Sequence, residues 1–119
     1  MFVIHEGSYQ SENPIYQKIP ISDTHRPMFI PEARVAKDYF NTGFYERPFV
    51  DWTCDNFLNA DKCVIDIGAH IGWYAVDMAK KAKHVYAFEC SPKSFNYLCA
   101  NIALNGLDYN ISKYNCALS

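Results

Sequence analysis

Two acidic residues and a pair of closely spaced glycines are the groups in this sequence that could hold a cofactor. Asp66 ends an apolar run, Gly68 and Gly72 follow it, and Glu89 lies about 20 residues further along the chain. Glycines at a strand-to-helix turn allow a tight backbone bend and the close approach of a ligand. An acid at the end of the next strand can accept hydrogen bonds from two ribose hydroxyls. The spacing therefore predicts an adenosine-containing cofactor lying across the ends of two strands.

The elements that would position these residues alternate between strand and helix, which predicts an α/β fold with a parallel sheet. Apolar runs predict the strands, and periodic apolar residues predict the helices between them. The second helix has the clearest signals, because Ser91 can cap it, Pro92 suits its first position and Gly106 follows its end. The expected order is a strand, a helix, a strand, a helix and a strand, at Cys63–Gly68, Gly72–Lys83, Val85–Glu89, 92–105 and Ile111–Leu118.

The glycine spacing distinguishes between two classes of cofactor. A dinucleotide fingerprint, G-x-G-x-x-G, would place further glycines at positions 70 and 73, where this chain has His70 and Trp73. A bulky side chain at the third position would keep the helix away from the strand. The sequence therefore disfavours a nicotinamide-dependent oxidoreductase, which remains the rival enzyme class.

The motif D-x-G-A-H-x-G, formed by Asp66, Gly68, Ala69, His70 and Gly72, resembles motif I of class I S-adenosylmethionine methyltransferases. Within that class the chain is similar to the FkbM family. The later stretches AFECSPKSFNYLCANIALNG and NCALS also resemble that family, and the likeness covers roughly residues 45–119.

This resemblance implies S-adenosylmethionine as cofactor and methyl transfer to an oxygen atom of a small molecule or glycan. It implies a Rossmann-like sheet of which this chain supplies three strands, in the order 3-2-1, out of seven. The acceptor pocket and any catalytic base would lie in the missing strands. The alternative is an inactive half-domain that serves as a binding module. The expected cofactor-binding residues are Asp66, Gly68, Ala69, His70, Gly72 and Glu89.

Individual site residues have a structural role as their alternative. Gly68 and Gly72 could be ordinary turn glycines, and His70 could make only local hydrogen bonds at the turn. Asp66 could brace the turn or bind the amino group of a methionine moiety, and the two roles are compatible. Glu89 has the cleaner argument, because an unpaired acid at the end of an apolar strand is costly unless a polar group meets it.

Residues 1–60 are expected to form a loop-rich, partly helical N-terminal cap on a cofactor-binding half at residues 61–119. Prolines exclude long regular elements near the start, where short strands are expected at Met1–His5 and Tyr16–Ile21. Two helices are expected to begin at Pro31 and Pro48.

Composition sets further expectations. The net charge of −2 and the pI near 6.0 give no electrostatic signature of nucleic-acid binding, so no nucleic-acid partner is expected. Five cysteines, an odd number without a C-x-x-C pair, indicate neither disulfides nor a zinc site and suggest reduced core thiols. Without a signal peptide or a long apolar run, a soluble cytoplasmic protein is expected, with no membrane contact.

The first strand carries an expectation about association. Val64–Ile67 has the apolar character of a central strand, yet strand four is missing beside it. An unpaired edge of this kind recruits other strands. The chain is therefore expected to self-associate, or to bind a second chain that supplies the missing strands, and to show no methyltransferase activity alone.

Overall fold

The computed structural model describes residues 15–17, 28–31 and 47–119, and the chain divides into two compact units, residues 1–45 and 46–119. In the first unit β1 (Ile15–Gln17) pairs antiparallel with β2 (Met28–Ile30). The strand expected at Tyr16–Ile21 is thus present in part. The expected strand Met1–His5 and the helix expected after Pro31 lie outside the described residues.

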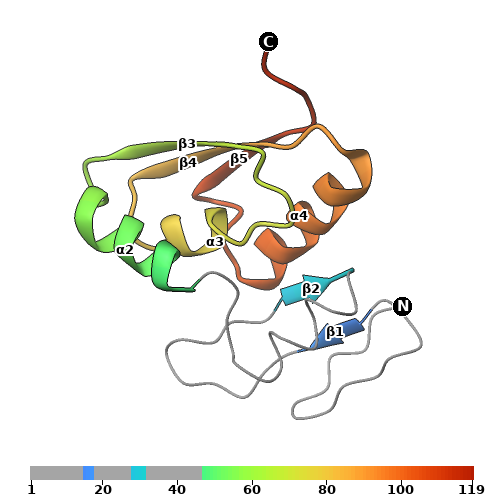
Figure 1. Ribbon diagram of the computed structural model, residues 1–119, viewed down its shortest axis with the longest axis horizontal. Helices are drawn as coiled ribbons and strands as arrows, with labels where there is room; N and C mark the ends of the chain where they lie inside the picture. The colour runs from blue at the N-terminus through green and yellow to red at the C-terminus, as the bar shows by residue number, and fades with distance from the viewer. Residues whose placement is uncertain (1–14, 18–27, 32–46) are drawn as a thin grey trace. The chain divides into compact units, whose positions relative to one another are not determined.

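The second unit contains the predicted α/β arrangement. Its strands form a parallel sheet in the order β3-β4-β5, which confirms the predicted order (Figure 1). The observed strands are each shorter than predicted at their carboxyl ends, where the chain turns away into the loops. The elements are α2 (Arg47–Phe57), β3 (Cys63–Ile67), α3 (Ala75–Met78), β4 (His84–Phe88), α4 (Pro92–Leu104) and β5 (Ile111–Tyr114).

The helices of this unit cover one face of the sheet (Figure 1). The core lies between them and includes Val76, Val85, Leu98 and Ile102, which are almost completely buried. On β3 the other face is open, and Ile65 and Ile67 are two-thirds exposed. The apolar character of this strand would suit a strand covered on both faces, but in the described residues the helices all pack on one side of it.

Beside Ile65 and Ile67, the open face carries aromatic side chains from the other two strands. Tyr86 and Tyr114 are partly exposed, and the rings of Phe88 and Tyr114 stack with their centroids 4.9 Å apart. Among the described strands β3 has a neighbour on one side only. The self-association expected from this edge stays a prediction.

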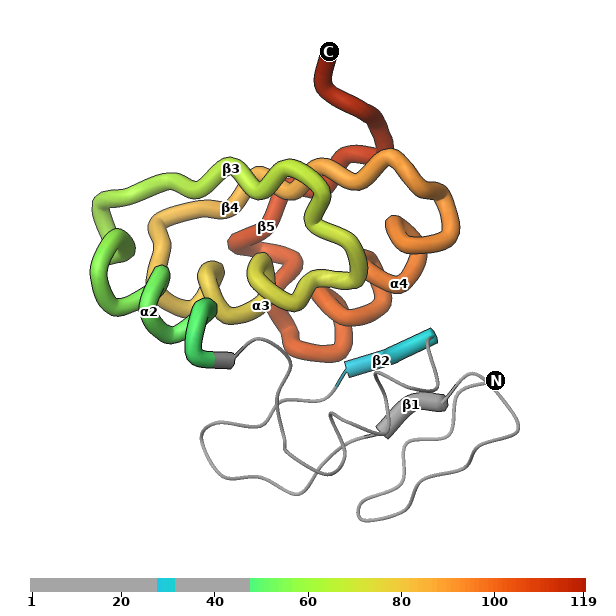
Figure 2. Tube along the Cα trace, in the orientation of Figure 1, coloured from blue at the N-terminus to red at the C-terminus, as the bar shows by residue number. Residues whose placement is uncertain are grey.

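Helix α3 is much shorter than the predicted Gly72–Lys83. The segment between β3 and α3, yellow-green in Figure 2, is a turn and not a helix. Its Gly72 has a φ of 101°, which is incompatible with a helical backbone. At the other end the backbone tightens, because the N–H groups of Lys80 and Lys81 donate to carbonyls three residues back. The periodic apolar residues that predicted this helix are nevertheless all buried: Ala75, Val76, Ala79 and Ala82.

Helix α4 matches its prediction closely. The Ser91 hydroxyl accepts a hydrogen bond from the Ser94 N–H at 3.3 Å, and Pro92 occupies the first turn. The helix ends at Leu104, and Gly106 follows with a φ of 68°. This helix borders the segment that holds the predicted site.

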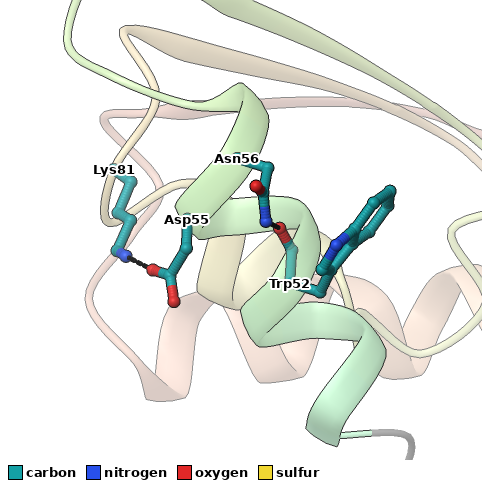
Figure 3. A network of polar contacts seen from close by, with 4 residues as sticks. All are labelled: Trp52, Asp55, Asn56 and Lys81. Atoms are coloured by element: carbon teal, nitrogen blue, oxygen red, sulfur yellow. Dashed lines mark hydrogen bonds and ion pairs between the residues drawn. The ribbon is translucent and has the colours of Figure 1, made fainter.

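Helix α2 packs on the core through Val50 and Cys54, both at most 5% exposed. An ion pair between Asp55 and Lys81 also links α2 to the turn after α3 (Figure 3). Both side chains are largely exposed, where water and salt screen their charges, so this pair adds little to stability. The apolar contacts therefore hold α2 in place.

The five cysteines are unpaired, but only one of them lies in the core. Cys54 is buried, Cys99 is partly buried, and Cys63, Cys90 and Cys116 are exposed. The prediction of core thiols is wrong for the exposed three, which lie at strand ends and not in the helix–sheet interface. Within the described residues, no helix is long and apolar enough to cross a membrane.

Asn110 provides a test of how the unit is held together. Its buried amide donates to the carbonyls of Ala79 and Ala82, and so fixes the end of the α3 segment. Asn110→Ala leaves these buried carbonyls without a donor and should lower the free energy of unfolding by about 1–3 kcal/mol. The measurement is urea denaturation. Asn56→Ala is the matched control, because its amide also donates to a carbonyl, that of Trp52, but at an exposed position where water can replace it (Figure 3).

Candidate functional site

The candidate site lies at the carboxyl edge of the parallel sheet. The register places Ile67 of β3 opposite Phe88 of β4, and Phe88 opposite Tyr114 of β5. The segments that follow these residues therefore begin at the same level. In open α/β sheets this edge is where ligands bind.

The turn after β3, residues 68–72, has three left-handed backbone positions. Gly68 has a φ of 78°, His70 of 53° and Gly72 of 101°. A positive φ is uncommon for a residue with a side chain, so the surroundings of His70 must hold it there. The glycine-spaced turn is thus a specific backbone shape, as its sequence predicted.

The N–H groups of this turn are bound within the chain. Gly68 and Ala69 both donate to the Phe88 carbonyl, at 2.8 and 3.0 Å, and His70 donates to a Glu89 carboxylate oxygen at 2.8 Å. These three N–H groups are therefore not available to bind an anion, because Phe88 at the end of β4 and the following residue, Glu89, supply their acceptors.

The two glycines meet different surroundings. A Cβ atom at Gly72 would lie 3.2 Å from Leu98 Cδ1 and 3.4 Å from Val76 Cγ2, so this glycine is needed for packing. A Cβ atom at Gly68 would have nothing within 4 Å. Gly68 therefore offers open space beside its backbone, which suits the close approach of a ligand.

Glu89 accepts hydrogen bonds from two backbone groups. Its Oε2 accepts from the His70 N–H and its Oε1 from the Ser91 N–H, each at 2.8 Å, and the residue is 7% exposed. Polar groups do meet the acid, as the sequence argument required, but they belong to the chain itself, so the burial of Glu89 does not by itself require a ligand. Each carboxylate oxygen can accept a further hydrogen bond, so Glu89 can still bind hydroxyl groups.

Asp66 presents the opposite situation. Its Oδ2 is buried and has no hydrogen-bond partner among the described residues. Burial, and then the charge of Glu89, raises the pKa of the Asp66 carboxyl to about 6. An unsatisfied carboxylate oxygen of this kind is costly, and a bound ammonium group would relieve it. The site thus fits a ligand with hydroxyl groups near Glu89 and a cationic group near Asp66.

Sequence reasoning missed two asparagines that hold this edge together. Asn101 of α4 is completely buried and donates to the Ile71 carbonyl at 2.7 Å. Asn115 donates to the carbonyl of Glu89 at 2.8 Å. A signal for Asn101 was available, since an amide within the apolar face formed by Leu98 and Ile102 must have a buried partner.

The structure brings the predicted site residues together along this edge. Asp66 and Glu89 are close enough for their charges to interact, and residues 68–70 donate hydrogen bonds to Phe88 and Glu89. His70 takes part through its backbone N–H. Trp73, which occupies the third glycine position of a dinucleotide fingerprint, is 5% exposed.

The chain matches the family model described as the TRM5/TYW2 methyltransferase domain over residues 35–118. It is 44% identical over 52 residues to a tRNA(Phe) (4-demethylwyosine(37)-C(7)) aminocarboxypropyltransferase of Methanocaldococcus jannaschii, covering 42% of this chain and 21% of that protein. It is 40% identical over 50 residues to a tRNA (guanine(37)-N(1))-methyltransferase of Ciona intestinalis, covering 42% of this chain and 11% of that protein.

Among solved structures, Trm5b of Pyrococcus abyssi is similar with a TM-score of 0.52 and 27% identity, over 56% of this chain and 20% of that chain. The chain thus spans about a fifth or less of the length of these relatives. The matched fold is the Rossmann-like fold of class I methyltransferases. The predicted fold and the predicted cofactor, S-adenosylmethionine, are confirmed.

Two predictions need correction. The matching family is not the FkbM family that the sequence resembles, because the motif around Gly68 is shared across class I methyltransferases and does not separate their families. The exclusion of nucleic acid is also wrong, since the relatives named above are tRNA-modifying enzymes. The net charge of this chain describes only the segment that matches those longer proteins.

Asp66 should lower the stability of the unliganded protein. Because its pKa is higher in the folded chain than in the unfolded chain, stability falls as pH rises from about 4 to about 6 and stays lowered above. Asp66→Asn should therefore raise the free energy of unfolding by about 1–3 kcal/mol near pH 8 and change it little near pH 4. Urea denaturation at both pH values measures this difference. The exposed Asp61→Asn is the control, and an equal effect of both variants would contradict the argument.

Proposed function

The chain belongs to the TRM5/TYW2 methyltransferase family, and we propose that it is the cofactor-binding part of an enzyme that transfers a methyl group from S-adenosylmethionine to a base of tRNA. The observation that carries this proposal is the family match over residues 35–118, which includes the whole glycine-spaced turn. The acceptor is taken from the names of the relatives. A tRNA base replaces the small molecule or glycan expected from the sequence.

The proposed roles of the site residues follow from their surroundings. Asp66 Oδ2, buried and without a partner among the described residues, accepts from the amino group of the methionine moiety. Glu89 uses its remaining acceptor positions for the ribose hydroxyls. Gly68 lets the ligand approach its backbone. Ala69, His70 and Gly72 give the turn its shape through their bonds to β4 and their packing against α4.

The chemistry needs little from these residues beyond binding and orientation. S-adenosylmethionine supplies a sulfonium group whose methyl carbon is open to attack by a base nitrogen, with S-adenosylhomocysteine as the leaving group. The protein must hold the acceptor in line with the breaking carbon–sulfur bond and exclude water. No residue of this chain is assigned to the acceptor, in keeping with the small share of the relatives that it covers.

The charges of residues 47–119 agree with a role in binding the cofactor and not the acceptor. Three of the six lysines in residues 47–119 are paired with acids: Lys80 with Asp77, Lys81 with Asp55, and Lys113 with Asp108. Paired lysines form no extended basic surface for phosphates. We therefore assign the phosphate contacts to other parts of the complete enzyme.

A second candidate is transfer of the aminocarboxypropyl group of the same cofactor. The relative from Methanocaldococcus jannaschii, at 44% identity, carries that activity in its name. The methylene carbon on the other side of the sulfonium would then be attacked, and methylthioadenosine would leave. Both reactions use the same cofactor, so the site residues above serve either.

Cofactor binding is tested by isothermal titration of the chain with S-adenosylhomocysteine and with NAD. We expect S-adenosylhomocysteine to bind more tightly. Glu89→Gln should weaken it by about tenfold or more, because the variant loses charge-assisted hydrogen bonds to the ribose. Glu89→Gln is preferable to Glu89→Ala, which would remove both acceptors of the His70 and Ser91 N–H groups. Tighter binding of NAD would overturn the cofactor assignment.

The acceptor is tested with the complete enzyme, unmodified tRNA transcripts and two preparations of radiolabelled S-adenosylmethionine. One preparation is labelled in the methyl group and the other in the carboxyl carbon. Transfer of the methyl label alone supports the leading proposal, and transfer of the carboxyl label alone supports the second candidate. If neither label is transferred to tRNA and a sugar or lipid is labelled instead, a tRNA acceptor is refuted.

A further inference from the structure

We propose that Asn101 is a positioning residue for the cofactor, which holds the turn after β3 in its binding shape from the opposite side to Glu89. This inference rests on the proposed function, because it concerns affinity for that cofactor. Asn101 lies on α4, a helix that contributes none of the predicted cofactor-binding residues.

The turn is bound from two directions. On one side, the Phe88 carbonyl at the end of β4 and the carboxylate of the next residue, Glu89, accept from residues 68–70. On the other side α4 provides the Asn101 amide, which donates to the Ile71 carbonyl at 2.7 Å. Asn101 is 0% exposed and Ile71 is 1% exposed, so water cannot replace this bond.

The hydrogen bond acts on one particular peptide unit, between Ile71 and Gly72. Its carbonyl accepts from Asn101, and its N–H donates to the Ala69 carbonyl at 2.9 Å. Rotation of this unit would break both bonds. Because His70 and Gly72 on either side have positive φ values, the orientation of this peptide decides the shape of the whole turn.

Packing at the neighbouring residue supports the same arrangement. Leu98, one turn before Asn101 on α4, lies where it would meet any side chain at position 72. Helix α4 thus contacts the turn at two consecutive residues, with a hydrogen bond at Ile71 and a close apolar contact at Gly72. Loss of the hydrogen bond would leave Gly72, the residue with most backbone freedom, free to change conformation.

A purely structural role for Asn101 is the alternative, and Asn110 provides the control that separates the two. Asn110 is also a buried asparagine whose amide donates to backbone carbonyls, those of Ala79 and Ala82. These carbonyls lie beyond α3, outside the turn at residues 68–72. Equivalent substitutions at both positions should therefore cost similar stability, while only the one at Asn101 should alter the cofactor site.

The experiment compares Asn101→Asp and Asn110→Asp in the 119-residue chain. Each substitution keeps the side-chain shape and replaces the donating amide with an acceptor that repels the carbonyl. Isothermal titration gives the dissociation constant of S-adenosylhomocysteine, and urea denaturation gives the stability. Hydrogen exchange of the Gly72 N–H reports on the turn itself. Asn101→Ser and Asn110→Ser serve as a milder pair if the first pair does not fold.

We expect the Asn101 variant to bind S-adenosylhomocysteine about tenfold more weakly or worse, and to exchange the Gly72 N–H faster. The Asn110 variant should bind within about twofold of the parent chain at similar stability. Equal affinities in the two variants, with the parent chain binding normally, would overturn the role of Asn101 alone. Failure of the parent chain to bind would overturn the proposed function as well, so the two failures are distinguishable.

Discussion

The buried carboxylate of Glu89 is the group on which the arrangement of the site depends. By accepting from the N–H groups of His70 and Ser91, it joins the turn after β3 to the start of α4. Ser91 in turn caps α4, whose residue Asn101 binds back to the turn. Glu89 thus connects the turn and α4 through hydrogen bonds, and these bonds hold the turn in its shape in the absence of a ligand. Such preorganisation lowers the cost of ordering the site on binding.

Asp66 is placed at the expense of stability. A carboxylate with a buried oxygen lacking a partner in the described residues, next to the charge of Glu89, opposes folding at neutral pH. Nothing in the sheet requires an acid there, since Val64 in the same strand shows that an apolar residue fits the same face. This loss of stability is explained if a cationic group of the ligand forms an ion pair with Asp66. Functional sites commonly retain unfavourable groups of this kind.

The sequence predicted those features that depend on local patterns. The caps of α4, the parallel strands and the positions of Asp66 and Glu89 all follow from residue types at short spacing. The length of α3 did not, because Asn110 and the positive φ of Gly72 act against its helical periodicity. The pairing of Glu89 also escaped prediction, since its partners are backbone N–H groups that any sequence contains. Likewise Asn101 meets Ile71 only after α4 has packed, a contact between residues thirty positions apart.

The error about nucleic acid has a similar physical origin. Charge predicts an acceptor only when the residues that bind the acceptor are counted, and this chain covers at most about a fifth of the named relatives. Two of those relatives are tRNA-modifying enzymes that differ in the group named for transfer, yet they match nearly the same share of this chain. In the proposed roles, Glu89 binds the cofactor's hydroxyl groups and Asp66 its amino group, and neither contact chooses which carbon beside the sulfur reacts. That choice depends on the direction from which the acceptor approaches, and therefore on parts of the enzyme other than residues 68–72.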